Sequence, residues 1–165
     1  QTLNLLLGYY TDGLVTHRLA APIRAAIPDC PVDFAAELQR LWRVRQESEV
    51  GSVIVALEFL PHAQFDDLAL QIQRQRRSLD LSWLIETAAR KVLVTLMPLG
   101  GSAAAEGYLM RVEQWVRRQG NQTLSEAGIF AHVVPVDEPP PLRVLDQLFE
   151  VCHVPAETRT LRTGA

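Results

Sequence analysis

A glycine turn with polar and aromatic residues stands near the start of the chain. Residues 7–13 read Leu-Gly-Tyr-Tyr-Thr-Asp-Gly and follow an apolar run. A strand that runs into such a turn is a frequent place for catalytic or binding groups in α/β proteins. This turn offers Tyr9, Tyr10, Thr11 and Asp12 but no serine, cysteine or lysine. These residue types favour ligand or partner binding over nucleophilic catalysis, and they suggest a vacated or repurposed active-site turn.

Two later loops contribute the other candidate binding residues. One holds Gly100, Gly101 and Ser102, where the serine is placed to cap a following helix, and the other holds Asp137 and Glu138. A phosphate cradle needs glycines that let backbone N–H groups approach the anion. The glycines here follow neither nucleotide-binding pattern, and the nearby carboxylates would repel a phosphate. We therefore expect no nucleotide site and no cofactor.

Histidine and cysteine spacing argues against a metal site. The four histidines form no HxxxH or HxH pair, and the two cysteines have no metal-like spacing. Cys30 and Cys152 are isolated, which predicts a reducing compartment and hence a cytoplasmic location, with a periplasmic one left open.

The positions of these loops depend on the elements between them. Four short apolar runs are typical of strands buried on both faces: residues 3–9, 52–59, 91–99 and 129–136. Apolar residues at helical spacing follow each run. Strand and helix alternating four times predicts an α/β fold, with a doubly wound, mainly parallel sheet of about four or five strands and helices on both faces, as in flavodoxin-like proteins. The candidate loops would then meet at one sheet edge.

Two further stretches, residues 31–45 and 62–91, lie between these runs. Residues 31–45 could be a strand or a helix, and the spacing of Phe34, Leu38 and Leu41 fits a helix better. Residues 78–91 form a further element, with Ser78 or Asp80 as an N-cap. The cluster Arg-Gln-Arg-Arg (74–77) falls at a helix end, where positive charge suits the helix dipole. We interpret this cluster as a solvated face, since it has no interleaved aromatic residues.

Length and composition predict one folded domain. The 165 residues are 48% hydrophobic and 21% charged, with a net charge of −3. These values fit a globular protein and provide no general attraction to nucleic acid or anionic lipid. No apolar stretch reaches the roughly 20 residues of a membrane span. We expect residues 1–165 to be a single α/β domain of a longer protein.

The order of features resembles the SGNH/GDSL hydrolases, an α/β family of esterases and lipases. The run Lys-Val-Leu-Val-Thr-Leu-Met-Pro-Leu-Gly-Gly (91–101) is similar to a strand and loop of that family, and residues 106–138 are similar to the helix and strand that follow. Residues 7–13 stand at the position of the family's nucleophile turn, but Tyr9 and Tyr10 replace its Asp and Ser. Glu150 and His153 stand where the family has its acid and base, which implies those roles for them.

Two main hypotheses follow, with a third beside them. The first is a non-catalytic interaction or regulatory domain, derived from an enzyme-like fold, that contacts a protein partner or other domains of its own chain, or forms a homo-oligomer. The alternative is an SGNH-like esterase or deacetylase with a diverged site that uses His153. The third is a small-molecule sensor with a pocket between the turn at residues 9–12 and the loop at residues 100–102.

Overall fold

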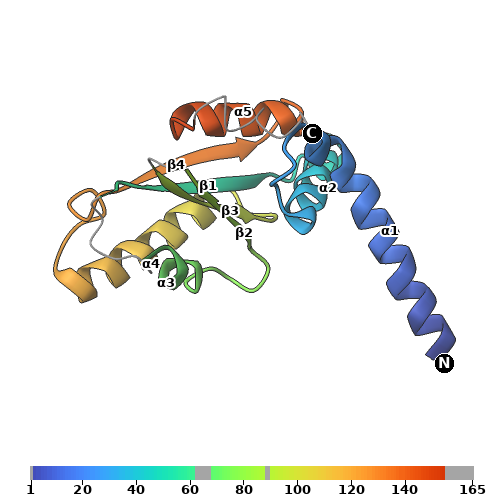
Figure 1. Ribbon diagram of the computed structural model, residues 1–165, viewed down its shortest axis with the longest axis horizontal. Helices are drawn as coiled ribbons and strands as arrows, with labels where there is room; N and C mark the ends of the chain where they lie inside the picture. Colours follow the sequence, from blue (N-terminus) through green and yellow to red (C-terminus); the bar gives the residue numbers. More distant parts are fainter. Residues whose placement is uncertain (1, 62–67, 88–89, 155–165) are drawn as a thin grey trace.

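The computed structural model describes residues 2–61, 68–87 and 90–154, with residues 2–12 described by their backbone only. In chain order the elements are α1 (Thr2–Ala26), α2 (Val32–Ser48), β1 (Ser52–Phe59), α3 (Leu68–Gln73), β2 (Leu81–Glu86), β3 (Lys91–Met97), α4 (Ser102–Gly120), β4 (Ile129–Val136) and α5 (Pro141–Val151). Figure 1 shows a sheet with helices on both sides and α1 extending away from it.

The sheet is antiparallel throughout, in the order β2-β3-β1-β4. The expected doubly wound, mainly parallel sheet is therefore wrong. The two β-α-β units are present, because β1 and β2 run parallel to each other, as do β3 and β4. However, β3 lies between the first pair and β1 lies between the second. Each unit thus places its neighbour's strand between its own two strands, as in split β-α-β folds.

Helices cover both faces of the sheet, which explains why β1 is buried along its whole length. Ile54 and Ala56 point into a core shared with α1, α2 and α5, whereas Val55 and Leu57 point into a core shared with α3 and α4. In the first core Trp83 makes edge contacts with Phe34 of α2 and Phe149 of α5, at centroid distances of 5.7 and 5.9 Å. A continuous apolar run therefore indicates a strand that is covered on both faces of the sheet. It does not indicate whether neighbouring strands run parallel or antiparallel.

Two predicted elements have a different structure. Residues 3–9 belong to α1 and not to a strand, in keeping with their leucine content, since leucine is a strong helix former. Residues 81–86 form β2, an edge strand that pairs with β3 in a hairpin closed by the N–H of Thr87 and the carbonyl of Arg90 at 2.8 Å. Residues 31–45 fall in α2 (Val32–Ser48) except for Pro31, which is its N-cap, and the expected strands at 52–59 and 129–136 are confirmed.

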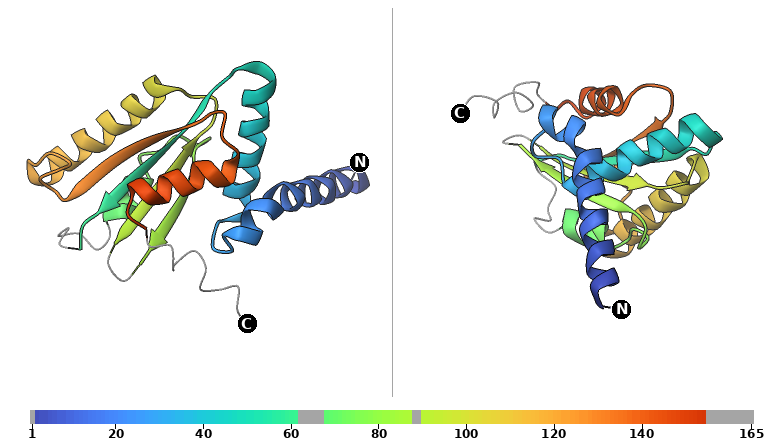
Figure 2. Two further views of the ribbon diagram at one scale, coloured as in Figure 1. Left: turned by 90° about the horizontal axis from the view of Figure 1, so that it is seen from above. Right: turned by 90° about the vertical axis from the view of Figure 1, so that its right-hand side faces the viewer.

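Figure 2 shows the N-terminal part of α1 projecting beyond the rest of the domain in both views. Ala20 and Ile23 of its C-terminal part are buried, while Leu14 and Val15 are half exposed. In the ranges that the structure describes, no helix is long and apolar enough to cross a bilayer.

Candidate functional site

The strands end at two opposite edges of the antiparallel sheet, and the predicted site residues are divided between these two sets of strand ends. The loops after β3 and β4 share one edge, because Met97 pairs with Val53 and Val136 pairs with Ser52 at the start of β1. The segment that leads into β2 reaches this same edge, since Leu81 pairs with Leu96. Glu58, near the end of β1, lies at the opposite edge.

At the first edge the predicted residues have mainly structural contacts. Gly101 and not Ser102 is the N-cap of α4, and no side chain caps that helix. Asp137 accepts a hydrogen bond from Nε of Arg45 at 2.8 Å, which raises the pKa of that guanidinium. The carbonyl of Glu138 accepts a hydrogen bond from the indole of Trp42 at 3.4 Å. Tyr9, Tyr10, Thr11 and Asp12 lie in α1, and their side chains are outside the described part.

His153 lies at the opposite edge, just after α5, in a left-handed conformation with φ of 52°. Its ring is 70% exposed, and its Nδ1 lies 4.0 Å from Oε1 of Glu58. Glu150 is exposed on α5 and contacts His153 through the backbone, its carbonyl accepting the His153 N–H at 3.1 Å. The geometry thus pairs the histidine ring with Glu58.

Glu58 is a buried carboxylate with three cationic or imidazole neighbours. Its side chain is 3% exposed, and Oε2 lies 3.1 Å from Nε2 of His132. Oε1 forms an ion pair with Arg90, without a well-directed hydrogen bond. Burial lowers the pKa of His132, which favours its neutral form. This cluster ties β1 to β4 and to the chain that enters β3. Within the described ranges no group of side chains is placed to hold a metal ion.

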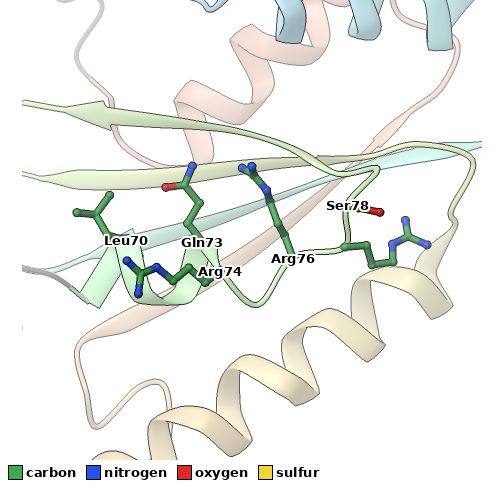
Figure 3. A pocket seen from close by; sticks show the side chains of 6 residues that line it. Leu70, Gln73, Arg74, Arg76 and Ser78 are labelled. Atoms are coloured by element: carbon green, nitrogen blue, oxygen red, sulfur yellow. The ribbon is translucent and has the colours of Figure 1, made fainter.

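A pocket rich in arginine lies beside the segment between α3 and β2. It has a volume of about 340 Å³ and is lined by Leu70, Gln73, Arg74, Arg76, Arg77 and Ser78, and we call it the arginine pocket. Helix α3 ends at Gln73, so that the chain turns and presents three guanidinium groups within four residues. Figure 3 shows Arg74 beside Leu70, while Gln73 and Arg76 point toward the sheet.

Asp80 holds the side chain of Arg77 in place. The Asp80 side chain is fully buried and accepts hydrogen bonds from Nε and Nη2 of Arg77, at 3.1 and 2.9 Å to Oδ1. Oδ2 accepts the Arg77 backbone N–H at 2.9 Å, and the Asp80 N–H donates to the Arg77 carbonyl at 3.1 Å. Both ends of the turn are thus closed by the same two residues. The Arg77 side chain is 42% exposed, so that it can still donate hydrogen bonds to a ligand.

The other two arginines differ in how firmly they are held. Arg76 and Gln73 both donate to the hydroxyl of Ser82 on β2. Arg74 has no carboxylate partner among the residues that the structure describes. A ligand with negative charge would therefore meet one fixed guanidinium on Asp80, one held against the sheet, and one with no competing anion in the described structure.

The predicted loop at Gly100 is adjacent to this pocket. A Cβ at Gly100 would lie 3.6 Å from Nη2 of Arg77. The start of α4, the positive end of its dipole, is therefore next to the arginines. Sequence reasoning identified the loop but not its neighbours. The available signal was three arginines in four residues followed by an aspartate, in a protein of net charge −3.

Comparisons with known proteins place these features in a family. The family model described as the PelD GGDEF domain matches residues 28–152, more than half of the chain. PelD 158-CT from Pseudomonas aeruginosa PAO1 superposes with a TM-score of 0.65 and 20% sequence identity, over 76% of this chain and 45% of that one. PelD 156-455 from Pseudomonas aeruginosa PA14 in complex with c-di-GMP superposes with a TM-score of 0.66 and 20% identity, over 78% and 47%.

The chain spans less than half the length of these solved structures. No curated protein sequence gives a significant match. The family match and the antiparallel sheet together show that the resemblance to SGNH/GDSL hydrolases is wrong, and with it the description of the domain as SGNH-like or as a doubly wound, flavodoxin-like fold. The apolar patterns behind that resemblance occur in any sheet covered on both faces.

Proposed function

The chain belongs to the PelD GGDEF domain family, and from this premise we propose that it is a non-catalytic regulatory domain that binds c-di-GMP in the arginine pocket. The solved structure of PelD in complex with c-di-GMP supports the choice of ligand. The single observation that carries the location is the cluster of Arg74, Arg76 and Arg77 around one pocket in an acidic protein.

The chemistry of the pocket fits a cyclic guanine dinucleotide. Such a ligand carries two phosphates and two guanine bases, and arginine recognises both groups. The planar guanidinium matches two phosphate oxygens, or the O6 and N7 acceptors of guanine, with two parallel N–H donors. Arg77 is pre-oriented by Asp80, so little side-chain freedom is lost when it binds. Asp80 acts here as a positioning residue, because its carboxylate is buried.

The sequence supports binding without turnover. The letters of the family name spell Gly-Gly-Asp-Glu-Phe, and this string does not occur in the chain. A regulatory role then requires a change that another domain or protein detects.

We place that contact on α1. The apolar residues Leu14 and Val15 of α1 are half exposed, and the N-terminal part of this helix extends away from the domain (Figure 1). Tyr9, Tyr10, Thr11 and Asp12 precede them on the same helix, and their role in contacting a partner remains a prediction.

Calorimetric titration with c-di-GMP tests the proposal. We expect the wild type to bind and the Arg74→Ala variant to bind about 10- to 100-fold more weakly, as for loss of a hydrogen bond between charged groups. Arg74 is the best choice because no described carboxylate depends on it. Arg118→Ala, an exposed arginine in the last turn of α4, is the matched control. Absence of binding to the wild type, or equal binding by both variants, contradicts the proposal.

A further inference from the structure

A second pocket adjoins the arginine pocket on the side of α4. It has a volume of about 460 Å³ and is lined by Leu70, Gln71, Arg74, Gln75 and Trp115, and we call it the Trp115 pocket. Leu70 and Arg74 line both pockets. The two spaces are therefore neighbours that share one apolar side chain and one guanidinium.

Trp115 offers an aromatic surface whose orientation is fixed from behind. It lies on α4 and packs against the apolar cluster between α4 and the sheet, but it remains partly exposed. An indole anchored on one side and open on the other is a suitable platform for stacking of a nucleobase. Gln71 and Gln75 add amide groups that can donate and accept hydrogen bonds at a base edge.

The size of the ligand requires more than the arginine pocket alone. At about 340 Å³ that pocket lies at the small end of the range for ligand sites, and c-di-GMP has two purine bases on opposite sides of its ring. One base with its phosphate matches the charged lining. The other base has a large apolar face, for which guanidinium groups alone provide little burial.

We propose that the Trp115 pocket is a second base subsite, in which one guanine of c-di-GMP stacks on the indole while Arg74 contacts the phosphate between the two pockets. This inference rests on the proposed function and adds to it a specificity determinant. It implies that the domain selects a dinucleotide because only a ligand with two bases fills both pockets.

Binding by Trp115 variants of the full chain tests the subsite. Trp115→Leu keeps an apolar side chain against the core but removes the aromatic surface, and we expect c-di-GMP affinity to fall about 5- to 100-fold. Trp115→Phe keeps an aromatic ring and should retain most of the affinity. Trp42→Phe, on α2 and outside both pockets, is the matched control and should bind as the wild type does.

A spectroscopic measurement keeps the test independent of variant folding. With 5-fluorotryptophan in all three tryptophan positions, c-di-GMP should shift the ¹⁹F resonance of Trp115 and leave those of Trp42 and Trp83 in place. If c-di-GMP binds the wild type and depends on Arg74, yet the Trp115 signal does not move and Trp115→Leu binds normally, the subsite is overturned while the proposed function stands. If the wild type binds no c-di-GMP, both are overturned.

Discussion

At the scale of single residues, Gly100 leaves room that a methyl group would fill. A Cβ at this position would lie 2.7 Å from the Cβ of Ala104 on α4, a contact that neither atom can relieve by rotating. At Gly101 nothing lies within 4 Å. The absence of a side chain at Gly100 therefore lets the loop after β3 pass close to α4, beside Arg77.

Gly100→Ala should lower the free energy of unfolding by about 1 to 3 kcal/mol, the usual cost of an overpacked contact. Gly101→Ala is the control, with a change expected within about 0.5 kcal/mol. Urea denaturation followed by circular dichroism measures both. Equal midpoints for the two variants would show that the loop moves away from α4 without cost.

The two cysteines should be inert while the protein is folded. Both side chains are buried, and burial raises the pKa of Cys30 to about 12 and that of Cys152 to about 11. At pH 8 the reactive thiolate is then at most about 0.1% of either residue. We expect a thiol reagent such as DTNB to label the native protein slowly and to label two thiols per chain in urea. Fast labelling of the native protein would contradict the burial of at least one of them.

At the scale of elements, Glu58 connects the ends of several of them. Its carboxylate pairs with Arg90 ahead of β3 and with His132 on β4, and it lies near His153 after α5. A buried carboxylate that is deprived of its charge leaves the guanidinium of Arg90 without a compensating anion.

Glu58→Gln should therefore lower the free energy of unfolding by about 1 to 3 kcal/mol, less than for a fully buried ion pair because Arg90 is one-third exposed. Glu86→Gln is the control at the same sheet edge. Its ion pair with Lys91 is 3.8 Å long and exposed, and we expect it to contribute less than about 0.5 kcal/mol. Similar midpoints for both variants in urea would mean that Glu58 contributes no more to the stability of the fold than the exposed Glu86 does.

The elements also show what the sequence can predict. The strands at Ser52–Phe59 and Ile129–Val136 and the helices after them were identifiable, because their apolar patterns are set by burial. Strand order was not, because burial on both faces is the same in parallel and antiparallel sheets. The edge strand at Leu81–Glu86 was missed because its residues are only partly buried and its pattern is weak.

The site was harder to predict from the sequence than the fold. Residues 100–102 were selected for their glycines and as a possible binding loop; of these, Gly100 lies next to Arg77, and a binding role for the loop remains a prediction. The arginines at 74–77 were set aside as a solvated face, since charge alone does not distinguish solvent from a ligand. The distinguishing feature is the Arg77–Asp80 ion pair, which closes a turn. The spacing of these two residues indicates an ion pair only when the chain between them is known to form a turn.

At the scale of the whole molecule, the two β-α-β units interleave so that each adds a strand between the other's strands. The arginine pocket lies where the first unit's crossover, through α3, meets the start of α4 in the second unit (Figure 3). A ligand in this position contacts parts of both units. It should therefore stabilise the domain as a whole and not only the turn that it touches.

This stabilisation has a predictable size. A ligand that binds only the folded state at 100 times its dissociation constant adds about 2.7 kcal/mol to the free energy of unfolding. We expect c-di-GMP at that concentration to raise the urea midpoint of the wild type, with the denaturant slope unchanged, since the surface exposed on unfolding stays the same. Arg74→Ala at the same ligand concentration should show a shift smaller by about 1.4 kcal/mol or more, while Arg118→Ala should match the wild type. Heat of binding without any shift in the midpoint would mean that the ligand binds the folded and unfolded chains equally well, or binds a segment that unfolds separately. Either outcome would argue against a site that joins the two units.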